Sequence, residues 1–182
     1  MVQTTNDITT LHFFLNTSCS SKTKVGGWSN IAVGEQGDII DIKEGYEVDT
    51  TSNRLQLLAF ASVLEQLQSV GASRKHIDVI VHTTSDYLQG TFMEWYQKWQ
   101  QNGWKTATGR TLENQDLLRT TTAQYIKVRT SYRNISIVTD KDQSNSKFFT
   151  IAATCALKWK LVLESESDKK PICTYNNFDK EE

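Results

Sequence analysis

Three tryptophans carry the most informative side-chain chemistry in this sequence. Trp95 and Trp99 are four residues apart, so on a helix their indoles lie on one face. Gly103 is placed to end that helix in a left-handed conformation, and Trp104 follows directly. Three indoles gathered at a helix end either pack a small core or form a flat aromatic platform. The residues alone favour the core, because large aromatic side chains are mostly buried.

The residue types that usually bind metals or act as nucleophiles are scattered. His12, His76 and His82 have no carboxylate or cysteine at metal-ligand spacing, which indicates structural or surface positions. The three cysteines are an odd number without metal-ligand spacing, which is typical of reduced thiols in the cytosol or nucleus. We therefore expect neither a resident metal ion nor a cofactor.

Size and charge narrow the class of protein. With 182 residues, of which 38% are hydrophobic, the chain suits one compact domain. The net charge of −1 gives no overall field that attracts nucleic acid or anionic lipid, so any polyanion site has to be local. The polar start, residues 1–10, lacks an apolar signal region, and no stretch is long enough to cross a membrane. We expect an intracellular protein, nuclear or cytoplasmic, without a membrane partner.

Hydrophobic periodicity and turn residues predict a mixed α/β domain. The expected elements are strands at 8–15, 28–33 and 39–48, a helix at 53–70, a strand at 77–81, helices around the tryptophans and at 114–125, a strand at 134–138 and a helix at 147–159. A meander followed by crossover units predicts a five-stranded sheet, with three antiparallel strands and then two parallel ones, flanked by helices. The domain is expected to span residues 10–162, between a short extension (1–9) and a charged tail (163–182) expected to be disordered.

Four segments give this order of elements a specific likeness. They are Asn16-Thr17-Ser18-Cys19 after the first strand, 51–57 at the start of the first long helix, 83–87 after the fourth strand, and the tryptophan-bearing stretch 95–107. In this order they resemble type 1 ribonuclease H, the enzymes that cut RNA in RNA/DNA hybrids. The likeness covers about residues 10–157, and the stretch 95–107 is similar to the family's handle. Residues 102–106 and Gly109 look more eukaryotic than bacterial.

The resemblance implies two Mg²⁺ ions, which clamp the attacking and leaving oxygens and are held by four carboxylates. The corresponding positions here are Asn16, Gln56, Thr84 and Phe149, and Thr139 stands where the family has a histidine. Asn16 and Gln56 keep the shape of a carboxylate without its charge, and Phe149 offers no ligand atom. The sequence therefore predicts a degenerate member of the family that is not an enzyme.

The alternative is that other acids replace the missing ligands. Asp86, Asp140 and Asp142 lie near the expected site along the sequence. Aspartates in surface loops are more often solvated than catalytic, and two metal ions need several converging carboxylates. We therefore favour their being solvated.

The resemblance also implies surfaces that read the hybrid through 2′-hydroxyl groups, base stacking and one DNA phosphate. The matching positions are Ser52, Asn53 and Ser85 for hydroxyl or backbone contacts, Tyr87 and Trp95 for the aromatic channel with Trp99 and Trp104 in the handle, and Thr51 and Asn114 for the phosphate pocket. Asp49 stands at the arginine position of that pocket and repels phosphate. Residues 100–102, Gln-Gln-Asn, replace the basic run of the handle and remove charges that bind by counterion release.

Three functions follow from these residues. The first is a catalytically inactive ribonuclease H-like scaffold that binds a protein partner through the sheet edge, the handle or the last helix. The second is a module that holds RNA/DNA hybrid or structured RNA without cutting it. The third is an active hybrid endonuclease. The missing carboxylates favour the first function, and the retained polar and aromatic residues support the second.

Overall fold

The computed structural model describes residues 9–69, 74–139 and 146–167. Its centre is a sheet with the strand order β3-β2-β1-β4-β5. The strands are β1 (Thr9–Cys19), β2 (Val25–Val33), β3 (Ile39–Val48), β4 (Arg74–Thr83) and β5 (Tyr132–Thr139). β1, β2 and β3 pair antiparallel, whereas β4 pairs parallel with both β1 and β5. The predicted five-stranded mixed sheet is confirmed.

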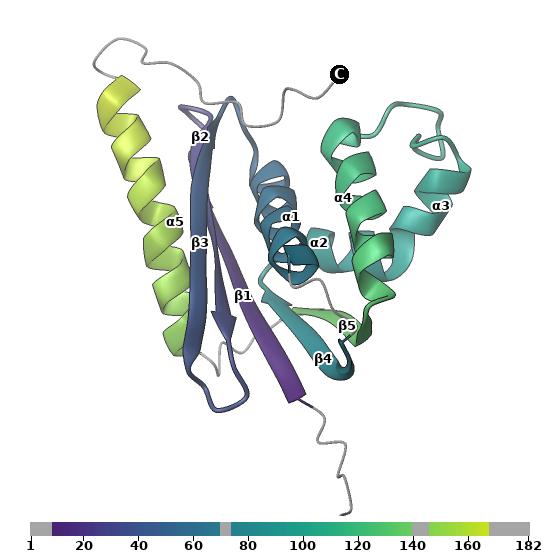
Figure 1. Ribbon diagram of the computed structural model, residues 1–182. Helices are drawn as coiled ribbons and strands as arrows, with labels where there is room; N and C mark the ends of the chain where they lie inside the picture. The colour runs from purple at the N-terminus through teal and green to yellow at the C-terminus, as the bar shows by residue number, and fades with distance from the viewer. Residues whose placement is uncertain (1–8, 70–73, 140–145, 168–182) are drawn as a thin grey trace, which may run out of the picture.

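Helices cover both faces of the sheet (Figure 1). They are α1 (Ser52–Ser69), α2 (Asp86–Gly90), the π-helix η1 (Thr91–Trp95), α3 (Tyr96–Gln101), α4 (Gln115–Arg129) and α5 (Ser146–Ser167). α5 lies alone on one face, and α1 to α4 lie on the other (Figure 1). In the described part of the chain, no helix combines the length and the apolar character that a membrane span requires.

Several predicted boundaries are wrong, and two of them concern the site and the tail. β1 does not end at Leu15, because residues 16–19 continue it and pair with Ser29 to Gly26 of β2. Pairing with a neighbouring strand therefore overrides the turn tendency of Asn16-Thr17-Ser18. α5 continues beyond residue 162 to Ser167, so the charged segment begins as helix. The predicted extension up to Ile8 and the rest of the predicted tail lie outside the described residues.

The alternation of β1 side chains divides the core into two layers. Phe13 and Leu15 belong to the larger cluster, under α1 and α4, whereas Phe14 belongs to the smaller cluster under α5. Gly26 and Gly27 of β2 let both helices approach closely. A Cβ atom on Gly26 would lie 2.5 Å from the Leu55 Cδ1 of α1, and one on Gly27 would lie 2.3 Å from the Ala156 carbonyl oxygen of α5. Close contact on both faces fixes the two helices relative to the end of β1.

Candidate nucleic-acid interface

The ends of β1 and β4 are joined by the side-chain amide of Gln56, from the first turns of α1. Its Nε2 donates to Thr17 Oγ1 at 3.2 Å, and its Oε1 accepts from Thr83 Oγ1 at 3.1 Å. Thr83 Oγ1 also accepts from the Ser85 backbone nitrogen at 3.1 Å. Gln56 and Thr83 are buried, so each bond replaces water that the groups would otherwise bind. The amide therefore ties two strand ends to the helix that covers them.

Asn16 and Thr84 lie beside this chain of hydrogen bonds. Asn16 is half-buried, and its Oδ1 accepts from the backbone nitrogen of Thr17 at 2.8 Å. Thr84 is exposed directly after β4. Ser85, next to it, caps α2 by accepting from the Leu88 backbone nitrogen at 3.2 Å. The structure thus brings three of the four predicted metal-ligand positions, and the predicted hydroxyl-reading Ser85, to one edge of the sheet.

Phe149, the fourth of these positions, is a core residue. It is buried, and its ring meets Phe14 edge-on with 5.5 Å between centroids. On the same face, His82 stacks on Phe14 at 4.4 Å, and His12 Nδ1 lies 3.0 Å from His82 Nε2. Burial lowers the pKa of His12, although Glu35 acts in the opposite direction. The start of α5 therefore contributes aromatic side chains to this edge. Phe149 offers no atom that could bind a metal ion.

These side chains do not fit a pair of Mg²⁺ ions. Mg²⁺ prefers anionic oxygen ligands in octahedral geometry, and the four positions carry two amides, one hydroxyl and one phenyl group. Across the described ranges, no three His, Cys, Asp or Glu side chains come together in a way that could hold a metal ion. Asp86 is exposed at the start of α2, while Asp140 and Asp142 lie outside the described residues. Thr139, at the position predicted to correspond to the family's histidine, donates from Oγ1 to Gln89 Oε1 at 3.3 Å.

The predicted phosphate pocket lies around Arg54. Thr51 Oγ1 accepts from the Arg54 backbone nitrogen at 3.3 Å. The Arg54 guanidinium binds Glu47 through Nε at 2.9 Å and Asp116 through Nη1 at 3.1 Å. Burial lowers the pKa of Arg54, but the hydrogen bonds and charges of these two acids outweigh it and raise the pKa. Burial likewise raises the pKa of Asp116, and hydrogen bonds from the Leu117 backbone and Arg54 bring it below its usual value.

Asn114 stands at the other side of this ion-pair network, two residues before Asp116. Its backbone is left-handed, with φ of 57°, and it precedes the first turn of α4. Its Nδ2 is buried and has no hydrogen-bond partner among the described residues. A buried amide donor without an acceptor costs free energy, so this group is well suited to an anionic oxygen.

The remaining predicted positions of this corner are Ser52, Asn53 and Asp49. Ser52 and Asn53 are exposed in the first turn of α1. Asp49 has a left-handed backbone, with φ of 52°, and lies between Glu47 and α1. With Glu47 and Asp116, it makes the corner more acidic than Arg54 alone can balance, so electrostatics weaken phosphate binding here.

The tryptophans divide between core and surface. Trp104 is buried in the larger core cluster, and Trp99 packs partly against that cluster. The Trp95 and Trp99 rings are 5.7 Å apart, so the two indoles share one side of the helix as predicted. Trp95 and Tyr87 are both half-buried, and burial raises the pKa of Tyr87. The core interpretation therefore holds for Trp104, and Trp95 and Tyr87 keep part of their surface accessible.

The helix that carries Trp95 contains a π-helical segment, η1, that the sequence did not predict. A Cβ on Gly90 would lie 2.5 Å from the Trp95 ring, so the indole packs directly on the Gly90 backbone. π-helical turns are frequent at functional sites. Gly103 ends the handle helices with φ of 63°, as predicted, and Trp104 also has a left-handed backbone with φ of 63°.

Sequence reasoning missed three residues that organise this edge. Thr17 and Thr83 hold the Gln56 amide, and Arg54 joins β3, α1 and α4. The signals were their places inside the matched segments: Thr17 follows Asn16, Thr83 precedes Thr84, and Arg54 lies three residues after Thr51.

The family is decided by a match over most of the folded chain. Residues 9–135 match the family model described as RNase H. The chain belongs to the ribonuclease H family. It is 36% identical over 107 residues to Ribonuclease H of Rhizobium meliloti (strain 1021), and the matched region covers 59% of this chain and 65% of the relative. It is 34% identical over 113 residues to Ribonuclease H of Dinoroseobacter shibae, covering 60% and 68%. The chain thus spans about two thirds of the length of these curated relatives.

Solved structures agree on the fold. The foamy viral protease-reverse transcriptase in complex with an RNA/DNA hybrid superposes with a TM-score of 0.68 at 13% identity, over 89% of this chain and 21% of that one. RNase H1 from the archaeon Halobacterium salinarum NRC-1 superposes with a TM-score of 0.55 at 15% identity, over 86% and 98%. At these identities the likeness concerns the ribonuclease H fold alone.

The prediction that this chain is not an enzyme is wrong. Relatives that share 34% to 36% identity with it are named Ribonuclease H, and this points to an enzyme. The prediction used the residue types at four positions, whereas the shared identity extends over more than 100 residues. The eukaryotic character of residues 102–106 stays a prediction.

Proposed function

We propose that this ribonuclease H domain binds RNA/DNA hybrids at the edge of the sheet where β1 and β4 end. The observation that carries the proposal is the buried Asn114 Nδ2, which has no partner within the described part of the chain and suits a phosphate oxygen. The half-buried Tyr87 and Trp95 add aromatic surface for the sugar–base side of a strand. The foamy viral reverse transcriptase, which shares the fold, is in complex with an RNA/DNA hybrid.

The polar groups of this edge are suited to the shape of a hybrid more than to its charge. Ser52, Asn53 and Ser85 are neutral groups that can donate to or accept from 2′-hydroxyl groups. Glu47, with Asp116, neutralises the Arg54 guanidinium, which leaves little free positive charge at this corner. We therefore expect weak binding that decreases with salt less steeply than binding by a basic protein does.

The test is a titration of fluorescein-labelled RNA/DNA hybrid at low salt with EDTA present, followed by fluorescence anisotropy. The Asn114→Asp variant keeps the size of the side chain and puts a carboxylate where phosphate is expected. It should weaken hybrid binding about tenfold or more, since a charge-assisted hydrogen bond is replaced by repulsion. Asn134→Asp, at an exposed position of β5, is the matched control and should bind like the wild type.

Wild-type dissociation constants no tighter than millimolar would remove the proposal, as would equal affinity of the two variants. The same labelled hybrid, incubated with Mg²⁺ or Mn²⁺ and resolved on a denaturing gel, measures cleavage independently of binding.

A second candidate function is protein binding along β3. β3 is an edge strand, and it exposes five large apolar side chains: Ile39, Ile40, Ile42, Tyr46 and Val48. An apolar edge strand with unpaired backbone groups is a template for pairing with another strand. We take a second copy of this chain as the occupant, with the two β3 strands antiparallel.

Sedimentation velocity at increasing protein concentration tests this contact. We expect the wild type to dimerise and Ile42→Lys to be monomeric, because a lysine on the edge opposes pairing. Met93→Lys, an equally exposed apolar residue of η1, should leave the dimer unchanged. A wild type that stays monomeric at all concentrations would contradict the interpretation.

A further inference from the structure

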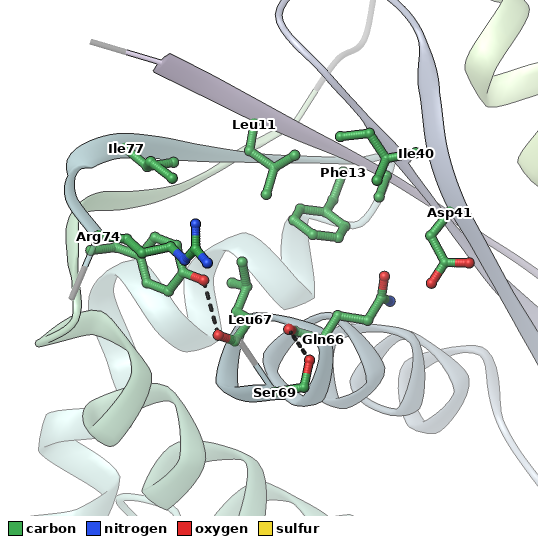
Figure 2. Close-up of a pocket in the computed structure, with 11 residues that line it drawn as sticks. Leu11, Phe13, Ile40, Asp41, Gln66, Leu67, Ser69, Arg74 and Ile77 are labelled. Atoms are coloured by element: carbon green, nitrogen blue, oxygen red, sulfur yellow. Dashed lines mark hydrogen bonds between the residues drawn. The ribbon is translucent and has the colours of Figure 1, made fainter. Parts of the chain in front are cut away.

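A pocket of about 260 Å³ lies at the end of the sheet opposite the proposed hybrid site. It is formed by the starts of β1, β3, β4 and β5 and the ends of β2 and α1, whereas the hybrid site uses the ends of β1 and β4 and the start of α1. Leu11, Phe13, Leu67 and Ile77 give the pocket an apolar wall (Figure 2). A small ligand with an apolar body fits such a wall.

Arg74 sets the chemistry of this pocket. Its side chain lies beside Ile77 and Leu67 at one side of the pocket, and Asp41 lies at the opposite side (Figure 2). The Arg74 Nε is buried, and within residues 9–69, 74–139 and 146–167 it has no hydrogen-bond partner. A buried guanidinium donor without an acceptor costs free energy that a bound anion would recover.

The other polar side chains of the pocket already have partners. Gln66 Nε2 donates to Asn30 Oδ1 at 3.0 Å, and Ser69 Oγ donates to the Gln66 carbonyl oxygen at 2.8 Å. Asp41 pairs with Lys43 at 3.4 Å, which compensates its charge. The wall also includes Tyr132, whose hydroxyl donates to the Leu67 carbonyl oxygen at 2.9 Å. Arg74 is therefore the polar side chain of this pocket whose buried donor would gain a hydrogen bond from a ligand.

Size and charge together define the ligand. An apolar protein cavity of about 150 Å³ holds benzene, so 260 Å³ has room for a bicyclic aromatic body. A planar carboxylate matches the fork of a guanidinium through two parallel hydrogen bonds. A phosphate would bring a more strongly hydrated charge into a mainly apolar hollow. We propose that this pocket binds an aromatic monocarboxylate, with the carboxylate on Arg74 and the rings against Leu11 and Leu67.

The probe for this site is 2-naphthoate, titrated into the full chain and followed by two-dimensional amide NMR spectra. We expect saturable shifts of the Leu11, Leu67 and Ile77 amides with a dissociation constant of about 1 mM or tighter, from the usual affinity per ligand atom. Amides of the hybrid site, such as those of Gln56 and Ser85, should not move. The neutral analogue 2-naphthylmethanol has the same rings, and its affinity should be lower by about tenfold or more.

Variants of the pocket test separately whether binding needs the Arg74 charge and whether it needs the apolar space. Arg74→Gln should weaken 2-naphthoate binding about tenfold or more, whereas Arg133→Gln, an exposed arginine on β5, should not change it. Leu11→Trp fills the pocket and should abolish binding without removing the charge. Should Arg74→Gln not fold, the neutral analogue and Leu11→Trp decide the question. The proposal is overturned by the absence of saturable shifts at about 10 mM ligand, by equal binding of acid and alcohol, or by shifts confined to other surfaces.

Discussion

Replacing Phe149 with aspartate, which puts a carboxylate at the fourth predicted metal-ligand position, lowers the free energy of unfolding by about 4 kcal/mol or more. Phe149 is 4% exposed and packs edge-on against Phe14 in the cluster under α5. The substitution removes a phenyl group from this cluster and places a carboxylate among apolar side chains. Burial then raises the pKa of the new carboxyl group, so part of the cost is recovered by protonation.

Urea denaturation of the wild type and the variant measures this loss. Phe149→Leu controls for packing and should cost less than about 1.5 kcal/mol, since it keeps most of the apolar volume. Thr150→Asp introduces the same charge at the next position, which is exposed, and should change stability by less than about 0.5 kcal/mol. A Phe149→Asp protein as stable as Thr150→Asp would show that the start of α5 is not packed on Phe14 as described.

The aromatic cluster and the Gln56 amide explain how this edge is held without clustered charges. In a site of several carboxylates, like charges repel and depend on cations for compensation. Here a neutral amide joins Thr17 to Thr83, and Phe149 closes the edge from the other face. The geometry of the edge is therefore maintained by hydrogen bonds and packing.

The fold could be read from the sequence because local signals agreed with tertiary packing. The β-rich run that includes Phe13, Phe14 and Leu15 marked a strand, and the apolar residues of 53–70 recurred at helical spacing. The signals failed where pairing decided the outcome. Residues 16–19 have turn composition, yet they extend β1 because β2 offers partners for their backbone groups.

The site was harder to derive than the fold, because its side chains act through partners that are distant in sequence. The matched segments identified Gln56, but its bonds to Thr17 and Thr83 depend on how α1 crosses two strands. The link from Arg54 to Asp116 joins residues 62 positions apart. The π-helical turn that ends at Trp95, whose indole lies against the Gly90 backbone, is not encoded by any periodicity of the sequence.

The second large effect on stability is expected in the handle, residues 95–107, because its tryptophans differ in burial. Trp104→Ala should lower the free energy of unfolding by about 3 to 5 kcal/mol, the usual cost of removing a buried aromatic side chain. Trp104 is 7% exposed, and its carbonyl oxygen accepts from the Leu112 backbone nitrogen at 3.2 Å and from Gln115 Nε2 at 3.1 Å. It thus connects the handle to the loop before α4, and its loss should loosen both.

Trp95→Ala is the matched control for this prediction, because the indole is half-buried and lies on the surface proposed to meet the hybrid. It should cost less stability than Trp104→Ala, while it weakens hybrid binding about tenfold through lost stacking. Thermal unfolding and the anisotropy titration, performed on both variants, separate packing from binding. If Trp104→Ala costs less than about 1 kcal/mol, Trp104 does not belong to the core. If Trp95→Ala binds hybrid like the wild type, the aromatic surface does not contact the nucleic acid.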